Sequence, residues 1–210
     1  TVWFGTFPLT TGVVATTVAG NSFDWTMTPA AIGSNVTITV TDGTATGHSE
    51  KFEVVSAPSI RIISPAAGDY WKVTETNTIS WIQGGRMSNA FVLAYSTYPF
   101  SITNLLSVGA FSNANNVFSY TWDPIPNALG RTRLIVTNME SAAIADQFEN
   151  FDIAAKFVIT PFAGDMYALL PVGVDWVTFG DVSNVDLYYS TDLLRAPGSW
   201  QKINTEGPYG

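Results

Sequence analysis

Few residues of this chain could take part in acid–base, nucleophilic or metal chemistry. His48 is the only histidine and cysteine is absent. A general base or a zinc site needs a histidine together with a positioned carboxylate, nucleophile or second ligand. His48 instead stands between Gly47 and Ser49 at a polar turn before a strand pattern, which predicts a solvated side chain. No nucleophile–base pair, glycine-rich phosphate loop or paired carboxylates at a workable spacing occurs, so we expect no enzymatic activity.

Two aspartates recur at one phase of an internal repeat. Asp69 and Asp165 each follow a glycine in the similar stretches 64–71 and 160–167. Oxygen ligands near the junctions of a rod can bind calcium and stiffen it, so both aspartates are calcium candidates. Calcium takes about six to eight oxygen ligands, and no Asp-x-Asp cluster lies nearby. A Gly-Asp turn explains the pair more simply, so we predict no metal and no other cofactor.

The seven tryptophans are compatible with a different chemistry, the stacking of exposed rings on sugar faces. Four share a repeating phase and lie within strand patterns: Trp25, Trp81, Trp122 and Trp176. Three have no such assignment: Trp3, Trp71 and Trp200. Tryptophan recurring at a fixed phase is typical of the core between two sheets. The exposure of these rings therefore distinguishes a structural array from a glycan-binding one.

One glycosylation sequon is present. Asn35 begins the sequence Asn-Val-Thr, the only Asn-x-Ser/Thr pattern of the chain. In a eukaryotic or archaeal secretory route, Asn35 could carry a glycan on the outward face of its strand.

Composition restricts the kinds of partner. The net charge is −8, the isoelectric point is near 4.4, and no run of Lys or Arg occurs. Nucleic-acid binding needs a clustered cationic surface, so nucleic acid is excluded as a partner. Charged residues make up only 12% of the chain, and Ser, Thr, Asn and Gly replace them, which favours an extracellular or cell-surface location. No run of about 18 apolar residues and no signal-peptide pattern is found, so we expect no membrane span in this segment.

The chain repeats itself about every 96 residues. Pro65 and its neighbours return around Pro161, and the triplet 95–97 (Tyr-Ser-Thr) returns at 189–191. Trp25 likewise returns as Trp122. Such self-similarity is the signature of a repeat array.

Strand patterns dominate each repeat. Val36, Ile38 and Val40 alternate with threonines, which predicts a half-buried strand with a threonine ladder on its other face. The central repeat contains seven short strand patterns, near 59–64, 77–82, 90–96, 102–108, 117–122, 131–137 and 147–153. Seven short strands in about 100 residues are typical of an immunoglobulin-like sandwich.

The expected fold is therefore all-β, a tandem array of immunoglobulin-like β-sandwiches with one complete and two partial units. Residues 1–57 would be the C-terminal part of a repeat, 58–155 a complete repeat and 156–210 the N-terminal part of another. The junctions at 56–58 and 154–156 are short, so neighbouring units should sit end to end with little hinge freedom.

Several motifs resemble a known family. The central unit has the pattern Ile62-x-x-Pro65-x-x-Gly68-x-x-Trp71, then Ile79-x-Trp81 and Tyr95-Ser96-Thr97. The third unit repeats it as Pro161-x-x-Gly164-x-x-Tyr167, Trp176 and Tyr189-Ser190-Thr191. These motifs resemble the Ig-like surface repeats of secreted bacterial and archaeal proteins, which are related to Ser/Thr-rich modules of fungal wall proteins. The resemblance implies extracellular, multi-domain, non-catalytic modules. The second unit departs from it by an apolar loop at Tyr98-Pro99-Phe100 and by lacking a tryptophan after Thr97.

The functional expectation is a structural segment of an extracellular surface, sheath or filament protein, built from rigid tandem Ig-like repeats. The alternative is an adhesive or carbohydrate-binding module array of a secreted hydrolase. Residues 1–57 and 156–210 should each lack strands that cover an apolar face. Those strands would come from neighbouring repeats of the chain or from neighbouring copies, so self-association and an elongated assembly are expected, with glycans as further candidate partners.

Overall fold

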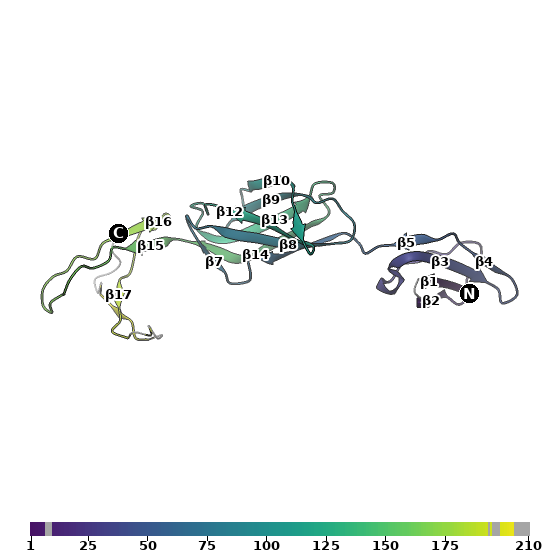
Figure 1. Ribbon diagram of the computed structural model, residues 1–210, viewed down its shortest axis with the longest axis horizontal. Helices are drawn as coiled ribbons and strands as arrows, with labels where there is room; N and C mark the ends of the chain where they lie inside the picture. Colours follow the sequence, from purple (N-terminus) through teal and green to yellow (C-terminus); the bar gives the residue numbers. More distant parts are fainter. Residues whose placement is uncertain (7–9, 193, 195–197, 204–210) are drawn as a thin grey trace.

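The structure is a computed structural model that describes residues 1–6, 10–192, 194 and 198–203. Three groups of strands follow one another along the long axis of the molecule (Figure 1). We call them the first unit (1–57), the central unit (58–155) and the third unit (from 156). Residues 204–210, which the expected third repeat includes, lie outside the described residues. Within the described part of the chain, no helix has the length and apolar character to cross a membrane.

The central unit consists of two sheets. One contains, in spatial order, β10 (Asn104–Ala110), β9 (Ala90–Thr97), β13 (Gly130–Asn138), β14 (Ala145–Ala154) and β7 (Tyr70–Lys72). The other contains β11 (Asn113–Ala114), β12 (Val117–Trp122), β8 (Asn77–Gly84) and β6 (Ser59–Ser64). Neighbouring strands are antiparallel, except that β14 and β7 are parallel. All seven strands expected in this unit are confirmed, and β7 and β11 are additional.

A core of large side chains lies between the two sheets. Trp81 has no exposed surface and packs against three phenylalanine rings, Phe91, Phe111 and Phe118, at centroid distances of 5.2–5.7 Å. Alternate residues of β9 and β13, such as Leu93 and Leu134, are also fully buried. Period-two burial on both layers is the packing expected of a β-sandwich.

The first unit is a single sheet. Its strands are β2 (Thr10–Ala15), β1 (Val2–Thr6), β3 (Gly33–Thr41) and β4 (Thr46–His48), and β5 (Phe52–Val54) also pairs with β3. The 3-10 helix η1 (Pro29–Ala31) crosses one face of the sheet, where Trp25 stacks on Phe4 at 5.2 Å. Trp25 is not in a strand, contrary to the sequence-based expectation. Among the described residues of the first unit, no strand of a second layer lies beside the segment that leads to η1.

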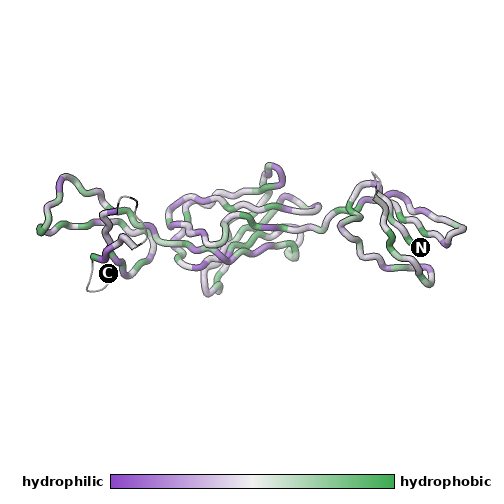
Figure 2. Tube along the Cα trace, turned by 90° about the horizontal axis from the view of Figure 1, so that it is seen from below, coloured by the Kyte–Doolittle hydropathy of each residue, from purple (hydrophilic) through white to green (hydrophobic). Residues whose placement is uncertain are grey.

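The third unit contains two hairpins. β15 (Lys156–Ile159) pairs with β16 (Trp176–Phe179), and β17 (Tyr188–Tyr189) pairs with β18 (Gln201–Lys202). Hydrophobic residues are spread along the extended segments of this unit (Figure 2). No described side chain in it falls in the buried class, whereas the central unit buries fifteen apolar residues in one cluster.

Strand positions relate the three units to one another. β3 and β13 have the same length and lie 97 residues apart. The order β2-β1-β3-β4 reproduces the order β10-β9-β13-β14 of the central sheet. In the third unit β15–β16 corresponds to the pair β6–β8, and Tyr189 pairs with Gln201 as Tyr95 pairs with Asn104. The repeat seen in the sequence is therefore a repeat of strands.

This correspondence shows what each outer unit lacks. The first unit has one layer of a sandwich, and the opposing layer (β6, β8 and β12 in the central unit) has no strand counterpart among its described residues. The third unit lacks counterparts of β12, β13 and β14 among its own described residues. Both outer units contain a counterpart of the β9–β10 pair. The two units are therefore overlapping parts of a repeat and do not simply add up to one sandwich.

The central core generates a prediction about stability. Replacing Trp81 with Ala in the isolated segment 58–155 should lower the free energy of unfolding by about 3–5 kcal/mol, because a buried aromatic ring is deleted. The matched control is Tyr70→Ala, whose side chain is 69% exposed and whose loss should cost no more than about 0.5 kcal/mol. Urea denaturation followed by circular dichroism measures both. Equal stability of the two variants would show that Trp81 is not the centre of the core.

Candidate interaction surfaces

The structure does not bring the candidate residues of the sequence together. His48 and Asn35 lie in the first unit, Asp69 in the central unit and Asp165 in the third. His48 is exposed, as expected, but it ends strand β4 and does not lie in a turn. Its Nδ1 lies 2.9 Å from Thr39 Oγ1 on the neighbouring strand. Thr39 and His48 are on neighbouring strands of the first sheet, and no ion pair between His48 and a carboxylate is found within the described part of the chain.

Asp69 serves a turn. Its Oδ2 accepts a hydrogen bond of 2.8 Å from the backbone N–H of Ala66, and Gly68 between them has a φ of 84°. Gly164, at the same phase of the third unit, has a φ of 77°, so the repeated Gly-Asp marks one turn type. Among the described residues, no three His, Cys, Asp or Glu side chains gather in a way that could hold a metal ion.

Asn35 is accessible for modification. Its side chain is exposed and its φ is 60°, at the irregular point where β3 shifts its register against β5. Asparagine tolerates this left-handed conformation better than most residues. The glycosylation of Asn35 stays a prediction.

The tryptophans divide by unit. In the central unit Trp71, Trp81 and Trp122 are at most 6% exposed, and Trp71 and Trp122 meet edge to face at 6.1 Å. In the outer units the tryptophan side chains are half-buried or exposed: Trp25, Trp176, Trp3 and Trp200. Sequence reasoning left Trp71 unassigned because a three-residue strand such as β7 has too little alternation to be recognised.

The apolar face of the first sheet is covered at one end only. Val36, which lies near Phe4 and η1, has no exposed surface, whereas Val40 is 55% exposed. Ile38 lies between them and is half-buried. Val36 pairs with Phe52 as Thr132 pairs with Phe151 in the central unit. The counterparts of Ile38 and Val40 are therefore Leu134 and Val136, which are both fully buried beneath the second layer. The Ile38–Val40 end of this face is therefore the part that a second layer would cover.

The third unit holds a cavity of about 810 Å³ between its two hairpins. Its lining is mainly apolar and includes Phe157, Ile159, Trp176, Leu187, Tyr188 and Trp200. Trp176 corresponds to Trp81, so the cavity occupies the place where β12, β13 and β14 fill the core of the central unit. Its shape is that of an incompletely filled sandwich core.

The first junction is held by close packing. A Cβ added to Gly85 would lie 2.5 Å from the carbonyl oxygen of Ser56 and 2.7 Å from that of Ala57. The φ angle of Gly85 is +69°. Only glycine fits such an approach without strain. An exposed ion pair of 2.8 Å between Arg86 and Glu53 spans the same junction.

The second junction is tied to the central unit by several contacts. Phe179 of β16 packs against the central core, and the N–H of Asp181 donates to Asn127 Oδ1 at 3.1 Å. Lys156 pairs with Glu75 at 3.3 Å. Each contact is modest alone, but together they join residues of the third unit to loops of the central unit.

Charged groups on the outer units stabilise turns and strand pairs. The backbone N–H groups of Ala45 and Thr44 donate to Asp42 and lower the pKa of its carboxyl group. The hydrogen bond to Asp186, 2.8 Å away, raises the pKa of Lys202. In the central unit, burial raises the pKa of Tyr95, whose ring packs on Trp122. These shifts belong to local structure, and none of them marks a reactive group.

Comparison with known proteins yields distant structural likenesses. No protein-family model matches the chain, and no curated protein matches it. A chimeric titin Z1Z2-Z1Z2 tandem functionalized with a GRGDS peptide from fibronectin is similar at 13% identity and a TM-score of 0.29. That likeness covers 56% of this chain and 62% of the titin chimera. The fibronectin(III)-like modules of Clostridium thermocellum CbhA match at 13% identity and a TM-score of 0.29, over 72% of this chain and 75% of theirs.

The sheets of the chain itself establish the class of protein. It is an all-β protein of immunoglobulin-like β-sandwich units, and the expected fold class is confirmed.

The turn at Asp69 can be tested against calcium binding. Asp69→Ala should lower the free energy of unfolding by about 1 kcal/mol, because one hydrogen bond to a carboxylate is lost. The loss should be the same with calcium and with a chelator, as measured by urea denaturation. If calcium stabilised the unsubstituted chain and Asp69→Ala abolished that gain, Asp69 would be a ligand.

Proposed function

We propose that this chain is a structural segment of an extracellular surface, sheath or filament protein, in which Ig-like repeats form a stiff rod. The observation that carries the proposal is the packing at both junctions. Gly85 lies against the backbone of residues 56 and 57, and Phe179 of the third unit reaches the central core. Units joined in this way lose the hinge freedom that a flexible linker would give.

The distribution of tryptophan favours this function over glycan binding. A glycan platform needs several exposed rings in a row, whereas the three tryptophans of the central unit are buried. The exposed rings of Trp3 and Trp200 lie in different outer units, the first in β1 and the second just before β18. A glycan could still bind in the third unit, where Trp176, Tyr188 and Trp200 line the cavity, and this is the remaining place for the glycan-binding alternative among the described residues.

The open faces of the outer units support a role in assembly. Val40 is 55% exposed in the first unit, and Trp200 is 45% exposed beside the third-unit cavity. Large apolar surfaces of this kind are covered in working proteins by further strands or by partners. We propose that neighbouring repeats or neighbouring copies supply these layers, which makes the assembly elongated. The low content of charge and the absence of cysteine fit an extracellular setting and an architecture that depends on its cores.

Electron microscopy of the native protein in negative stain tests this function. The structural role predicts fibres, sheets or long rods with an axial repeat that matches one sandwich unit. Incubation with polysaccharides should give neither binding nor turnover. Compact single particles that bind a polysaccharide, with binding lost in Trp200→Ala and kept in Trp3→Ala, would replace the proposal with the glycan-binding alternative.

A further inference from the structure

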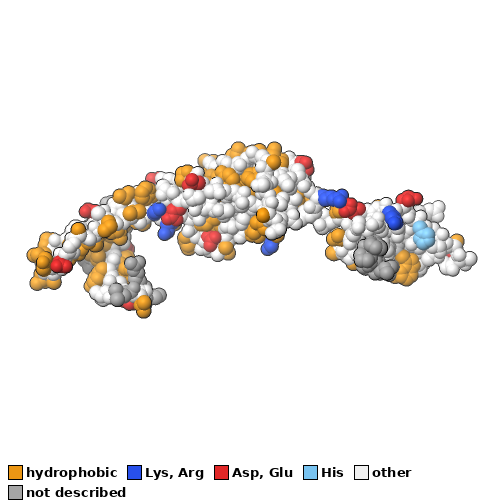
Figure 3. Space-filling model, in the orientation of Figure 1, with side chains coloured by type: hydrophobic (Ala, Val, Ile, Leu, Met, Phe, Trp, Pro, Cys, Tyr) orange, Lys and Arg blue, Asp and Glu red, His pale blue; other side chains and the backbone are white. Residues whose placement is uncertain are grey.

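Strand β10 forms an open edge of the central sandwich. It lies at the end of its sheet, with β9 on one side and no described strand on the other. Leu106 packs towards the core, while Leu105 and Val108 are 64% and 49% exposed. Hydrophobic side chains gather along this side of the central unit in Figure 3, where Figure 1 places β10.

This edge lacks the charges that usually protect edge strands. Natural proteins guard such edges with Lys, Pro, strong bulges or covering loops, because exposed backbone groups can pair with another chain. The sequence from Met87 to Trp122 contains no Asp, Glu, Lys or Arg, and β10 contains no proline. The register shift between Leu105 and Ser107 leaves residues 107–110 in regular pairing with β9. This end of β10 is therefore a regular, uncharged strand edge.

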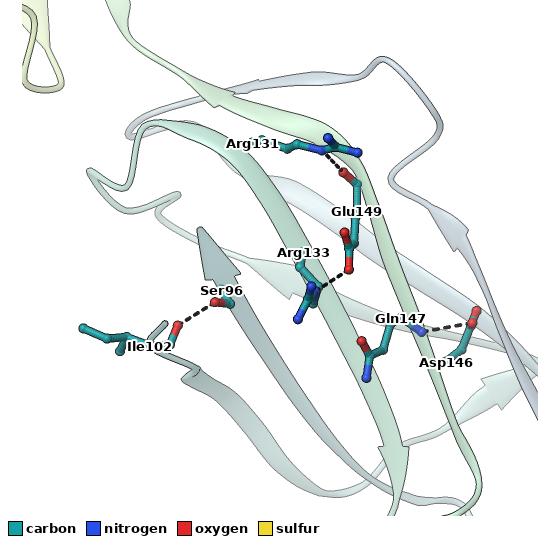
Figure 4. Close-up of polar contacts among 7 residues, drawn as sticks. All are labelled: Ser96, Ile102, Arg131, Arg133, Asp146, Gln147 and Glu149. Carbon is teal, nitrogen blue, oxygen red and sulfur yellow. Dashed lines mark hydrogen bonds and ion pairs between the residues drawn. The ribbon is translucent and has the colours of Figure 1, made fainter. Parts of the chain in front are cut away.

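The apolar loop before β10 extends the same surface. Tyr98 and Ile102 are 72% and 69% exposed, yet the loop is fixed to the sheet. Ser96 Oγ donates to the carbonyl oxygen of Ile102 at 2.7 Å (Figure 4). The guanidinium of Arg133 lies 4.3 Å from the centre of the Phe100 ring.

Arg133 also forms an ion pair with Glu149 of β14. Its Nε donates to Glu149 Oε1 at 2.5 Å, as Figure 4 shows. A loop held at Phe100 and at Ile102 presents its exposed side chains with little conformational entropy left to lose on binding. The loop and the strand edge together form one preorganised apolar surface.

We propose that β10 is a lateral interface at which it pairs, antiparallel, with β10 of a second copy of this chain. The self-complementarity of an antiparallel strand edge favours a second copy as the partner, and the lack of charge around β10 favours this edge as the place of contact. Two copies with a net charge of −8 repel each other. The electrostatic repulsion is smallest where the two copies meet through a surface without charged side chains. An antiparallel edge strand is complementary to itself, which gives a two-fold interface and one continuous sheet across both copies. This surface is separate from the open faces of the outer units, so it goes beyond end-to-end association.

Cysteine cross-linking tests the interface directly, because the chain has no cysteine of its own. A single Val108→Cys substitution in the full chain should give a covalent dimer under mild oxidation, since residues near a two-fold axis meet their own copies. The matched control is Ile63→Cys, an apolar residue 40% exposed on β6, the edge strand of the other sheet. It should remain monomeric on a non-reducing gel.

A charge at the same position provides the second measurement. In Val108→Lys, like charges would face each other across the two-fold axis, so the association constant from sedimentation velocity should fall by about tenfold or more. Leu105→Lys should act similarly if Val108→Lys does not fold, and Ile63→Lys should leave association unchanged. Cross-linking of Ile63→Cys equal to that of Val108→Cys would overturn the proposal, as would unchanged association of the β10 lysine variants. A monomer at every concentration would overturn it too.

Discussion

A sheet with one apolar face requires a second layer, and the rest of this structure depends on how that requirement is met. In the central unit β8 and β12 place Trp81 and Phe118 against Phe91 of the opposite sheet, and all three rings are fully buried. The first unit has the same sheet order without the second layer, so burial fades from Val36 to Val40 along one strand. In the third unit the missing strands leave a cavity. The same local sequence rules thus give a closed core only where both layers are present.

This requirement connects folding with the proposed role in assembly. Apolar surface that the first and third units leave uncovered within the described residues is a source of association energy. The contacts at the two junctions support the proposal that the open faces of the outer units are presented in fixed directions. The uncharged edge at β10 is independent of those faces. End contacts and a lateral edge contact together would build a two-dimensional or bundled assembly, which is the architecture expected of a sheath or filament wall.

Much of the central fold could be predicted from sequence because its strands alternate strongly and are separated by Gly, Pro and Asn. β6 and β12 begin and end where the pattern predicts. β7 was missed because its parallel pairing with β14 is a long-range contact that leaves only three residues of pattern. The sequence placed Trp25 in a strand because it occupies the same repeat position as Trp122. Trp122 lies in β12, which pairs with β8, and the described residues of the first unit contain no counterpart of β8. The candidate surfaces were harder to foresee: the apolar loop at Tyr98 was noticed, but its connection to an open edge depends on sheet order.

Hydrogen exchange of backbone amides, measured by mass spectrometry on the isolated chain and on the native assembly, tests the central claim most directly. β3 and β13 are counterparts of equal length, and only β13 lies in a closed sandwich. The account predicts that β3 and β16 exchange much faster than β13 in the isolated chain and become protected in the assembly, because a second layer covers them there. Equal protection of β3 and β13 in the isolated chain, or no gain by β3 and β16 on assembly, would contradict it.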